Sequence, residues 1–149
     1  MLSKKAKSLQ PVGGHSMLHR IYKTASLIGE LTTIVIGHDK DAVINETVKF
    51  NGNFNFAEQS KALGTADAVK CAMPKVSEES MVLVLYGDVP LIKEETLQKL
   101  ISNTNDSLSI LSTVLDVPFG YGRVKKDKDG FVTSITVSYT HLTLPTIYS

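Results

Sequence analysis

The stretch MVLVLYGDVP, residues 81–90, decides the fold of this chain. Five apolar residues open it without the polar alternation of a strand that has one face in water. Such a run is typical of a strand buried on both faces, as in a parallel sheet covered by helices. We therefore predict a central strand that ends just before Asp88, at the sheet edge where α/β proteins bind ligands.

Asp88 is a candidate magnesium ligand at the end of this predicted strand. Mg²⁺ prefers oxygen ligands and is often held by one or two carboxylates together with substrate phosphates. Gly87 has no side chain, so a ligand can approach the backbone closely there, and Pro90 helps to end the strand. The alternative is that Asp88 caps a turn or the next helix.

The rest of the chain alternates between strand and helix patterns. This order predicts a mostly parallel sheet with helices on both faces, which is an α/β fold. Strands are expected at 32–36, 54–57 and 107–115, a hairpin at 121–126 and 131–135, and helices at 17–28 (capped by Ser16), 39–48, 66–73 and 93–101.

Composition narrows the class of protein. The chain has 149 residues, 42% of them hydrophobic, and a net charge of +1, which argues against a general nucleic-acid binder. No apolar run approaches the roughly 20 residues that span a membrane. The single Cys71 cannot form an internal disulfide. We therefore expect a cytoplasmic protein that binds neither nucleic acid nor membrane.

The last stretch, residues 137–149, contains no Asp, Glu, Lys or Arg and continues no earlier pattern. It resembles the translation of a transposon-type sequencing adapter, so we leave it out of fold reasoning. The alternative is a genuine final strand. We expect one domain at 1–136 and a non-native tail at 137–149.

Three loops follow predicted strands and should gather at one edge of the sheet, namely 59–65, 87–88 and 120–123. Gln59 carries an amide donor and an acceptor, which suit the edge of a nucleobase. Gly64 and Thr65 open a helix, where backbone amides can meet a ribose or phosphate. The alternative for this pair is a plain helix cap. The backbone amide of Gly122 offers a donor to a ligand, and the alternative is a strand-to-strand turn. Lys7 is a cation near this edge, and the alternative is a solvated charge.

Three motifs carry a family resemblance: LGTADAV at 63–69, LYGDVPLI at 85–92 and DVPFGYGR at 116–123. They resemble the uridylyltransferase half of the bifunctional bacterial enzymes that make UDP-N-acetylglucosamine. The resemblance runs in order from the start of the chain to about Ile135. It implies a partial nucleotidyltransferase domain at 1–136 with a truncated Rossmann-like fold, a three-layer sandwich with a mostly parallel sheet.

The resemblance implies a nucleotide site. Lys7 matches a lysine near the nucleotide phosphates, and Gln59 matches a glutamine that reads uracil. Gly64 and Thr65 match the pair at the uracil and the ribose.

The resemblance also implies a sugar and metal site. Tyr86, Gly87 and Asp88 match the strand end that binds the nucleotide sugar, with Asp88 on Mg²⁺. Gly122 matches a glycine that contacts the acetamido sugar.

Several family features are absent from this chain. The family's Gly-x-Gly-Thr-Arg-Met loop should precede Lys7, whereas the chain starts at the methionine of that loop. The family has Pro where this chain has Ala6, and Lys where it has His15. A sugar-binding glutamate is expected near Val137, and the later asparagines and the acetyltransferase half are missing. We therefore expect an internal fragment of a longer, homo-oligomeric (trimeric) enzyme.

The implied reaction joins UTP and N-acetylglucosamine 1-phosphate to give UDP-N-acetylglucosamine and pyrophosphate, a step in peptidoglycan and lipopolysaccharide precursor synthesis. The attacking phosphate is already ionised, so no general base is needed. Positioning and charge neutralisation carry the catalysis. This fits a chain without a convincing nucleophile–base pair.

Three alternatives stay open at this point. The chain could belong to another sugar-phosphate nucleotidyltransferase with a different base or sugar. A strand-end Asp also accepts phosphate in signalling receiver domains, although no matching acidic pair or lysine is found here. The third alternative is an inactive polypeptide that folds poorly, since a sheet without its first strand exposes unpaired backbone.

Overall fold

The computed structural model describes residues 6–105 and 107–136, which divide into two compact units at residue 105. Residues 1–5 and the predicted tail at 137–149 lie outside the described residues. Within the described part, no helix combines the length and the apolar character that crossing a bilayer requires.

The first unit is built on a parallel pair of strands, β3 (Thr32–Ile36) and β4 (Phe54–Glu58). Their register runs without a break from Thr32 opposite Phe54 to Ile36 opposite Glu58. Parallel strands need a crossover connection, which α2 (Lys40–Thr47) supplies. Both strands and this helix confirm the prediction from the sequence.

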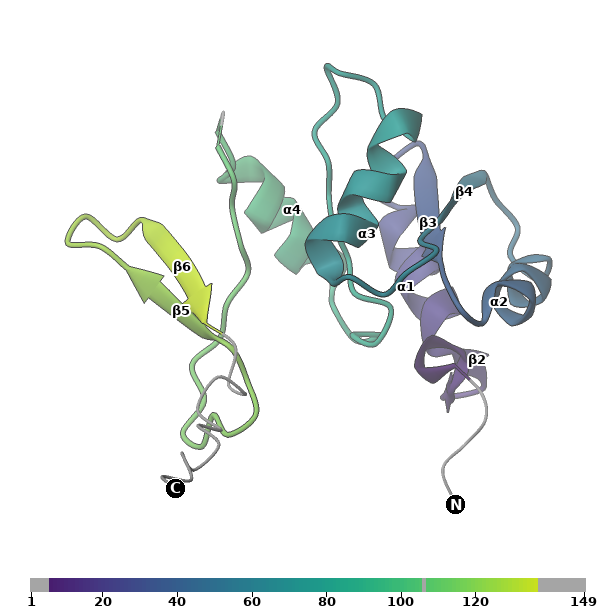
Figure 1. The fold of residues 1–149 in the computed structure, drawn as a ribbon, viewed down its shortest axis with the longest axis horizontal. Helices are drawn as coiled ribbons and strands as arrows, with labels where there is room; N and C mark the ends of the chain where they lie inside the picture. Colours follow the sequence, from purple (N-terminus) through teal and green to yellow (C-terminus); the bar gives the residue numbers. More distant parts are fainter. Residues whose placement is uncertain (1–5, 106, 137–149) are drawn as a thin grey trace, which may run out of the picture. The chain divides into compact units, whose positions relative to one another are not determined.

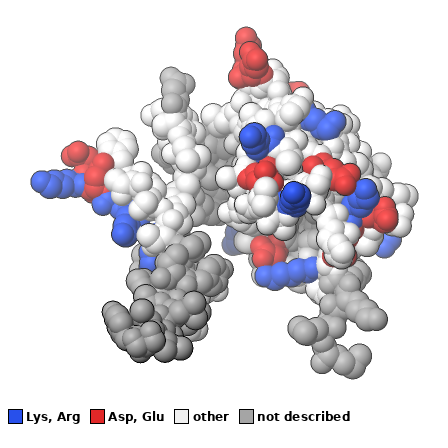
Figure 2. Space-filling view, in the orientation of Figure 1, with Lys and Arg blue, Asp and Glu red and all other residues white. Residues whose placement is uncertain are grey.

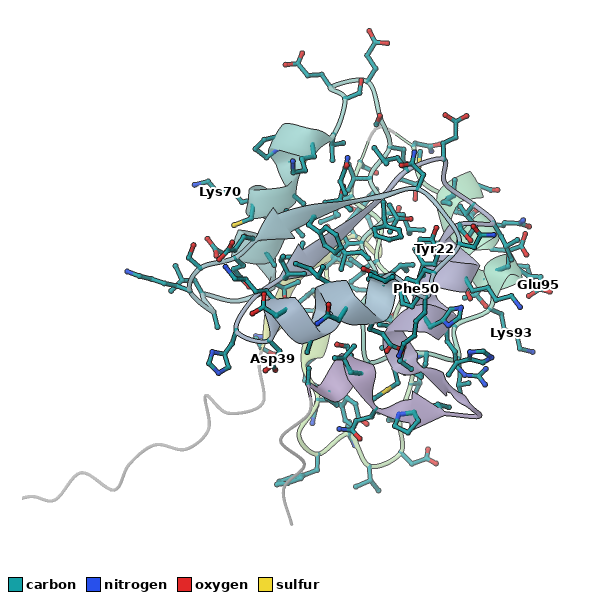
Figure 3. The ribbon with its side chains drawn as sticks, turned by 90° about the vertical axis from the view of Figure 1, so that its right-hand side faces the viewer. Tyr22, Asp39, Phe50, Lys70, Lys93 and Glu95 are labelled. Carbon is teal, nitrogen blue, oxygen red and sulfur yellow. The ribbon has the colours of Figure 1, made fainter. Side chains whose placement is uncertain are left out.

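Two helices cover the pair from opposite sides, α1 (Met17–Ala25) and α3 (Thr65–Ala72), as the two ribbon views show (Figures 1 and 3). The hydroxyl of Ser16 accepts a hydrogen bond of 3.2 Å from the His19 backbone amide, which confirms the predicted cap. A helix, a parallel strand pair and a second helix form three layers.

The core of the first unit lies between α1, α2 and one face of β3. Ile34 and Ile36 are buried there, since alternate residues of a strand share a face. The rings of Tyr22 and Phe50 stack with centroids 5.1 Å apart, and Phe54 meets Tyr22 edge-on at 5.6 Å (Figure 3). These offset and edge-on arrangements are those that aromatic pairs prefer.

Short elements complete the first unit. Leu97 of the helix α4 (Glu94–Ser102) is only 1% exposed, which confirms the amphipathic helix predicted after Asp88. The elements are η1 (Lys7–Leu9), an antiparallel pair of β1 (Pro11–Val12) and β2 (His15–Ser16), η2 (Met73–Lys75) and α4 (Glu94–Ser102).

The second unit contains the predicted hairpin, β5 (Arg123–Lys126) and β6 (Val132–Thr136), which are antiparallel. The carboxylate of Asp127 accepts hydrogen bonds from the backbone amides of Asp129 (3.0 Å) and Phe131 (2.8 Å). An acceptor two residues before its donor is typical of an Asx turn, so the turn closes by local chemistry.

Two predicted strands are wrong. Residues 81–86 and 107–115 belong to no strand, and their apolar side chains are largely exposed, as at Met81 (59%), Leu108 (93%) and Val114 (95%). A strand needs a neighbour that pairs with its backbone hydrogen-bonding groups. Residues 80–87 and β3 line the same cleft, and among the described strands β3 pairs with β4 and not with this segment. An apolar run is therefore not sufficient by itself to predict a paired strand.

The Ile34→Val variant should lower the free energy of unfolding by about 1 kcal/mol, because it removes a buried methyl group and leaves a small cavity. Val48→Ala is the control, since Val48 is 79% exposed, and should change it by less than about 0.5 kcal/mol. Urea unfolding measures both. Equal losses in the two variants would contradict this placement of the core.

Acid should destabilise the first unit through His19. Burial lowers the pKa of His19 below its ordinary value of 6.5, nearby His15, Lys23 and Arg20 lower it further, and Glu46 opposes them. The folded state therefore disfavours the proton that the unfolded chain accepts. The contribution of His19 to the free energy of unfolding is therefore fully present above about pH 6.5, and it is lost as the pH falls through the lowered pKa of the folded state.

Urea unfolding at about pH 7.5 and about pH 5.5 measures this loss, since the ordinary pKa of histidine lies between these values. His19→Gln should flatten the pH dependence, whereas His38→Gln, at an exposed position, should leave it unchanged. An unaltered slope in His19→Gln would show that another group is responsible.

Candidate functional site

A cleft of about 1150 Å³ opens in the first unit beside β3 and α3. Its walls are largely apolar, which is common for small-molecule sites with a few polar groups. Most of the predicted site residues of this unit line it. They are Gln59, Gly64, Thr65, Tyr86 and Gly87. Ser8, which the sequence did not point to, also lines the cleft.

Lys7 and Asp88 form an ion pair although they are 81 residues apart in sequence. The Nζ atom of Lys7 donates to Oδ2 of Asp88 at 2.7 Å. Both side chains reach solvent, with 76% and 39% exposed. An ion pair this exposed contributes at most about 1 kcal/mol to stability.

Gly87 allows η1 to come close to this turn. A Cβ atom at Gly87 would lie 3.3 Å from the Cβ of Ser8, tighter than most such contacts. This close approach places Lys7, the neighbour of Ser8, beside Asp88. We predicted that Gly87 admits a ligand; in the structure it admits the chain's own η1.

Tyr86, Gly87 and Asp88 lie in a turn after the apolar run. The turn is closed by a hydrogen bond of 3.1 Å from the Val89 amide to the carbonyl of Tyr86. Tyr86 is 58% exposed, and the Asp88 carboxylate pairs with Lys7. The Asp88 carboxylate therefore faces a cation at the surface.

Gln59 continues the parallel pair at its carboxyl end. Its backbone amide donates to the carbonyl of Ile36 at 2.8 Å. Its side-chain Nε2 donates to the carbonyl of Gly64 at 3.0 Å and to Oδ2 of Asp67 at 2.8 Å. Strand pairing thus fixes the backbone of Gln59, and the start of α3 fixes its side chain.

Gly64 has a conformation that requires glycine. Its φ is +104° and its ψ is −180°, a region almost closed to residues with a Cβ. It is the N-cap residue of α3, and its carbonyl oxygen accepts the first helical hydrogen bond, from the Ala68 amide at 3.2 Å. The turn at Gly64 therefore starts α3 at Thr65.

Gly122 belongs to the second unit. A Cβ there would lie 3.2 Å from the carbonyl oxygen of Thr136, so close packing inside the hairpin already favours glycine. Arg123 strengthens the loop through Nη1, which donates to the carbonyls of Pro118 (2.7 Å) and Tyr121 (2.6 Å). This local packing agrees with the turn alternative for Gly122.

Asp88 fits a divalent cation that takes its other ligands from elsewhere. Among the described residues, no group of three or more His, Cys, Asp or Glu side chains could hold a metal ion. A single carboxylate suits Mg²⁺, which keeps waters and substrate phosphates as ligands. Zinc or calcium would need more protein ligands.

Figure 2 shows acidic and basic side chains interspersed on the visible face, without a large field of one sign.

Two contributors to the site escaped the sequence analysis, Ser8 and Asp67. Ser8 has no signal in the sequence, because its contribution is the close approach of its Cβ to Gly87, a contact across the fold. Asp67 lies in the first turn of α3, where an acid is ordinarily explained by the helix dipole. Its hydrogen bond to Gln59 shows a second use.

Residues 2–117 match the family model described as the MobA-like NTP transferase domain. The chain belongs to this family. It is therefore a nucleotidyltransferase by family, and the signalling alternative is set aside. The match covers the first unit and the start of the second.

Bacterial relatives support the resemblance seen in the motifs. The chain is 44% identical over 137 residues to the bifunctional protein GlmU of Pseudomonas putida F1, covering 91% of this chain and 30% of that protein. It is 42% identical to the bifunctional protein GlmU of Neisseria meningitidis serogroup B over 136 residues, which cover 91% of this chain and 29% of that protein. The chain thus spans under a third of these relatives' length.

Solved structures confirm the fold class. HddC from Yersinia pseudotuberculosis superposes with a TM-score of 0.70 at 24% identity, covering 91% of this chain and 61% of that chain. The 4-diphosphocytidyl-2C-methyl-D-erythritol synthase from Anaerococcus prevotii gives 0.59 at 19% identity, with coverages of 89% and 63%. The predicted α/β fold is therefore correct, although the described residues contain one parallel pair of strands in place of the predicted larger sheet.

Asp88→Asn should change the free energy of unfolding by less than about 1 kcal/mol, because the pair with Lys7 is exposed. Leu97→Ala is the contrasting variant and should cost more than about 2 kcal/mol, since Leu97 is buried. Urea unfolding compares the two. A loss in Asp88→Asn as large as that in Leu97→Ala would make Asp88 a structural residue.

Proposed function

We propose that this chain carries part of an N-acetylglucosamine-1-phosphate uridylyltransferase site. The observation that carries the proposal is that Gln59, Gly64, Thr65, Tyr86 and Gly87 line one cleft. The 44% identity to a GlmU protein supports the choice of UTP and N-acetylglucosamine 1-phosphate as substrates, and of UDP-N-acetylglucosamine as product.

The reaction brings two polyanions together. An oxygen of the sugar phosphate forms a bond to the α-phosphorus of UTP, and the bond to the β-phosphate breaks to release pyrophosphate. In this proposal the ammonium of Lys7 binds phosphate oxygens and reduces their repulsion, at a point where it already holds a carboxylate. Gln59 binds the uracil, and Gly64 and Thr65 bind the uracil and ribose.

Asp88 would hold Mg²⁺, and Tyr86 and Gly87 would contact the nucleotide sugar. Bound Mg²⁺ supplies charge neutralisation and orientation of the phosphates. Asp88 contributes an anionic oxygen ligand from a turn whose backbone is closed by its own hydrogen bond. Gly122 is proposed to contact the acetamido group of the sugar.

Further proposals concern the longer protein. We propose a cytoplasmic homo-oligomer, trimeric through an acetyltransferase half, that supplies peptidoglycan and lipopolysaccharide precursors. These rest on the resemblance and on the bifunctional relatives.

Thermal unfolding of the chain with Mg²⁺ and UDP-N-acetylglucosamine tests the proposal. A ligand that binds the folded state alone stabilises it, by about 2.7 kcal/mol at a concentration 100 times its Kd. We expect the midpoint to rise with the uridine sugar. Asp88→Asn should lose the part of the rise that depends on Mg²⁺, while Asp129→Asn at the hairpin turn should keep it.

A broad transition that no ligand shifts would contradict the proposal for this chain and favour the alternative of an inactive, poorly folding polypeptide. A midpoint that rises equally with ADP-glucose or GDP-mannose would favour another sugar-phosphate nucleotidyltransferase. A rise that Asp88→Asn leaves intact would remove Asp88 from the metal site.

A further inference from the structure

The side-chain amide of Gln59 is anchored through its amino group. Nε2 donates to Oδ2 of Asp67 at 2.8 Å and to the carbonyl oxygen of Gly64 at 3.0 Å. Both partners are acceptors, and an ionised carboxylate has no proton to donate. The branch of the amide that faces them must be the amino group, because a carbonyl there would meet two oxygens.

The other branch of the amide is left to a ligand. An amide nitrogen has two hydrogens, and Asp67 and Gly64 take both. Within the described residues, the carbonyl Oε1 of Gln59 accepts no hydrogen bond. Gln59 is half-buried and lines the cleft, so it offers an acceptor to the cleft and no donor.

We propose that Asp67 is a positioning residue that holds the Gln59 amide with its carbonyl oxygen toward the ligand, and that this orientation selects a base with a ring N–H. This inference rests on the proposed function, because it concerns how the proposed nucleotide site distinguishes one base from another. Uracil has a hydrogen on N3, whereas cytosine has a lone pair there. A fixed acceptor therefore accepts from uracil N3 and repels cytosine N3.

Asp67 fixes the orientation more firmly than Gly64 does. A hydrogen bond to an ionised carboxylate is shorter and stronger than one to a neutral carbonyl, in line with the 2.8 and 3.0 Å distances. The Gly64 carbonyl also accepts from the Ala68 amide. Asparagine at position 67 would carry both a donor and an acceptor, so it would satisfy either orientation of Gln59.

A purely structural role for Asp67 is separable from this one. An acid in the first turn of a helix stabilises it through the dipole. Asp41 occupies the first turn of α2 in the same way, and no described side chain shares a hydrogen bond with it. Asp41→Asn is therefore a matched control for the helix effect of Asp67→Asn.

Isothermal titration of the full chain with UTP, CTP and 3-methyl-UTP, each with Mg²⁺, tests the inference. The methyl group replaces the N3 hydrogen and leaves the rest of the nucleotide unchanged. The native chain should bind UTP at least about tenfold more tightly than either analogue, the value of one good hydrogen bond. In Asp67→Asn this preference should fall to about threefold or less, since the amide is then free to turn. Asp41→Asn should keep the native preference.

Gln59→Leu separates failure of the inference from failure of the proposed function. Loss of the preference in both Gln59→Leu and Asp67→Asn supports the inference. Loss in Gln59→Leu with a native preference in Asp67→Asn overturns the role of Asp67 and leaves Gln59 as the reader of the base. A preference that survives Gln59→Leu overturns Gln59 as the reader of the base, and the inference with it, but leaves the nucleotide site in place. No binding of any of the three nucleotides by the native chain overturns the proposed nucleotide site itself.

Discussion

The parallel ladder between β3 and β4 is the constraint on which the rest of the first unit depends. Parallel strands end at the same edge, so the ladder brings Ile36 and Gln59 together and closes with a hydrogen bond between their backbones. The chain then turns at Gly64 into α3, which packs back on both strands. The backbone of Gln59 is thus placed by strand pairing and its side-chain amide by the start of α3.

The proposed site combines a rigid part with an exposed part. Gln59, Gly64 and Asp67 are joined by hydrogen bonds at the end of the ladder, which suits a role in recognition. Lys7 and Asp88 meet at the surface from segments far apart in sequence, because Gly87 lets η1 come close. In the proposed function Lys7 and Asp88 would exchange one another for phosphate and metal, and loss of their exposed ion pair would cost at most about 1 kcal/mol.

Local signals in the sequence predicted much of the fold. The strand at 32–36, the cap at Ser16 and the hairpin turn at 127–130 each depend on residues near in sequence, and the structure confirms them. The strand predicted at 81–85 is wrong, because a strand is a property of two neighbouring segments and the apolar run describes only one. The same reason applies to 107–115.

The candidate site was predictable only in part. The sequence analysis grouped Gln59, Gly64, Thr65, Tyr86 and Gly87 as one candidate site, and the structure puts them around one cleft. Contacts made across the fold were not predictable. An acid at position 67 reads as an ordinary helix-start residue until Gln59 is seen to donate to it.

The most direct test of the account is a map of backbone amide resonances of the ¹⁵N-labelled chain, recorded with and without Mg²⁺ and UDP-N-acetylglucosamine. The largest changes should fall together on Lys7, Gln59, Gly64, Thr65 and Asp88, the residues proposed to bind the nucleotide sugar and Mg²⁺. Changes confined to other parts of the chain, such as the aromatic cluster of Tyr22 and Phe50, or an unchanged spectrum, would contradict it.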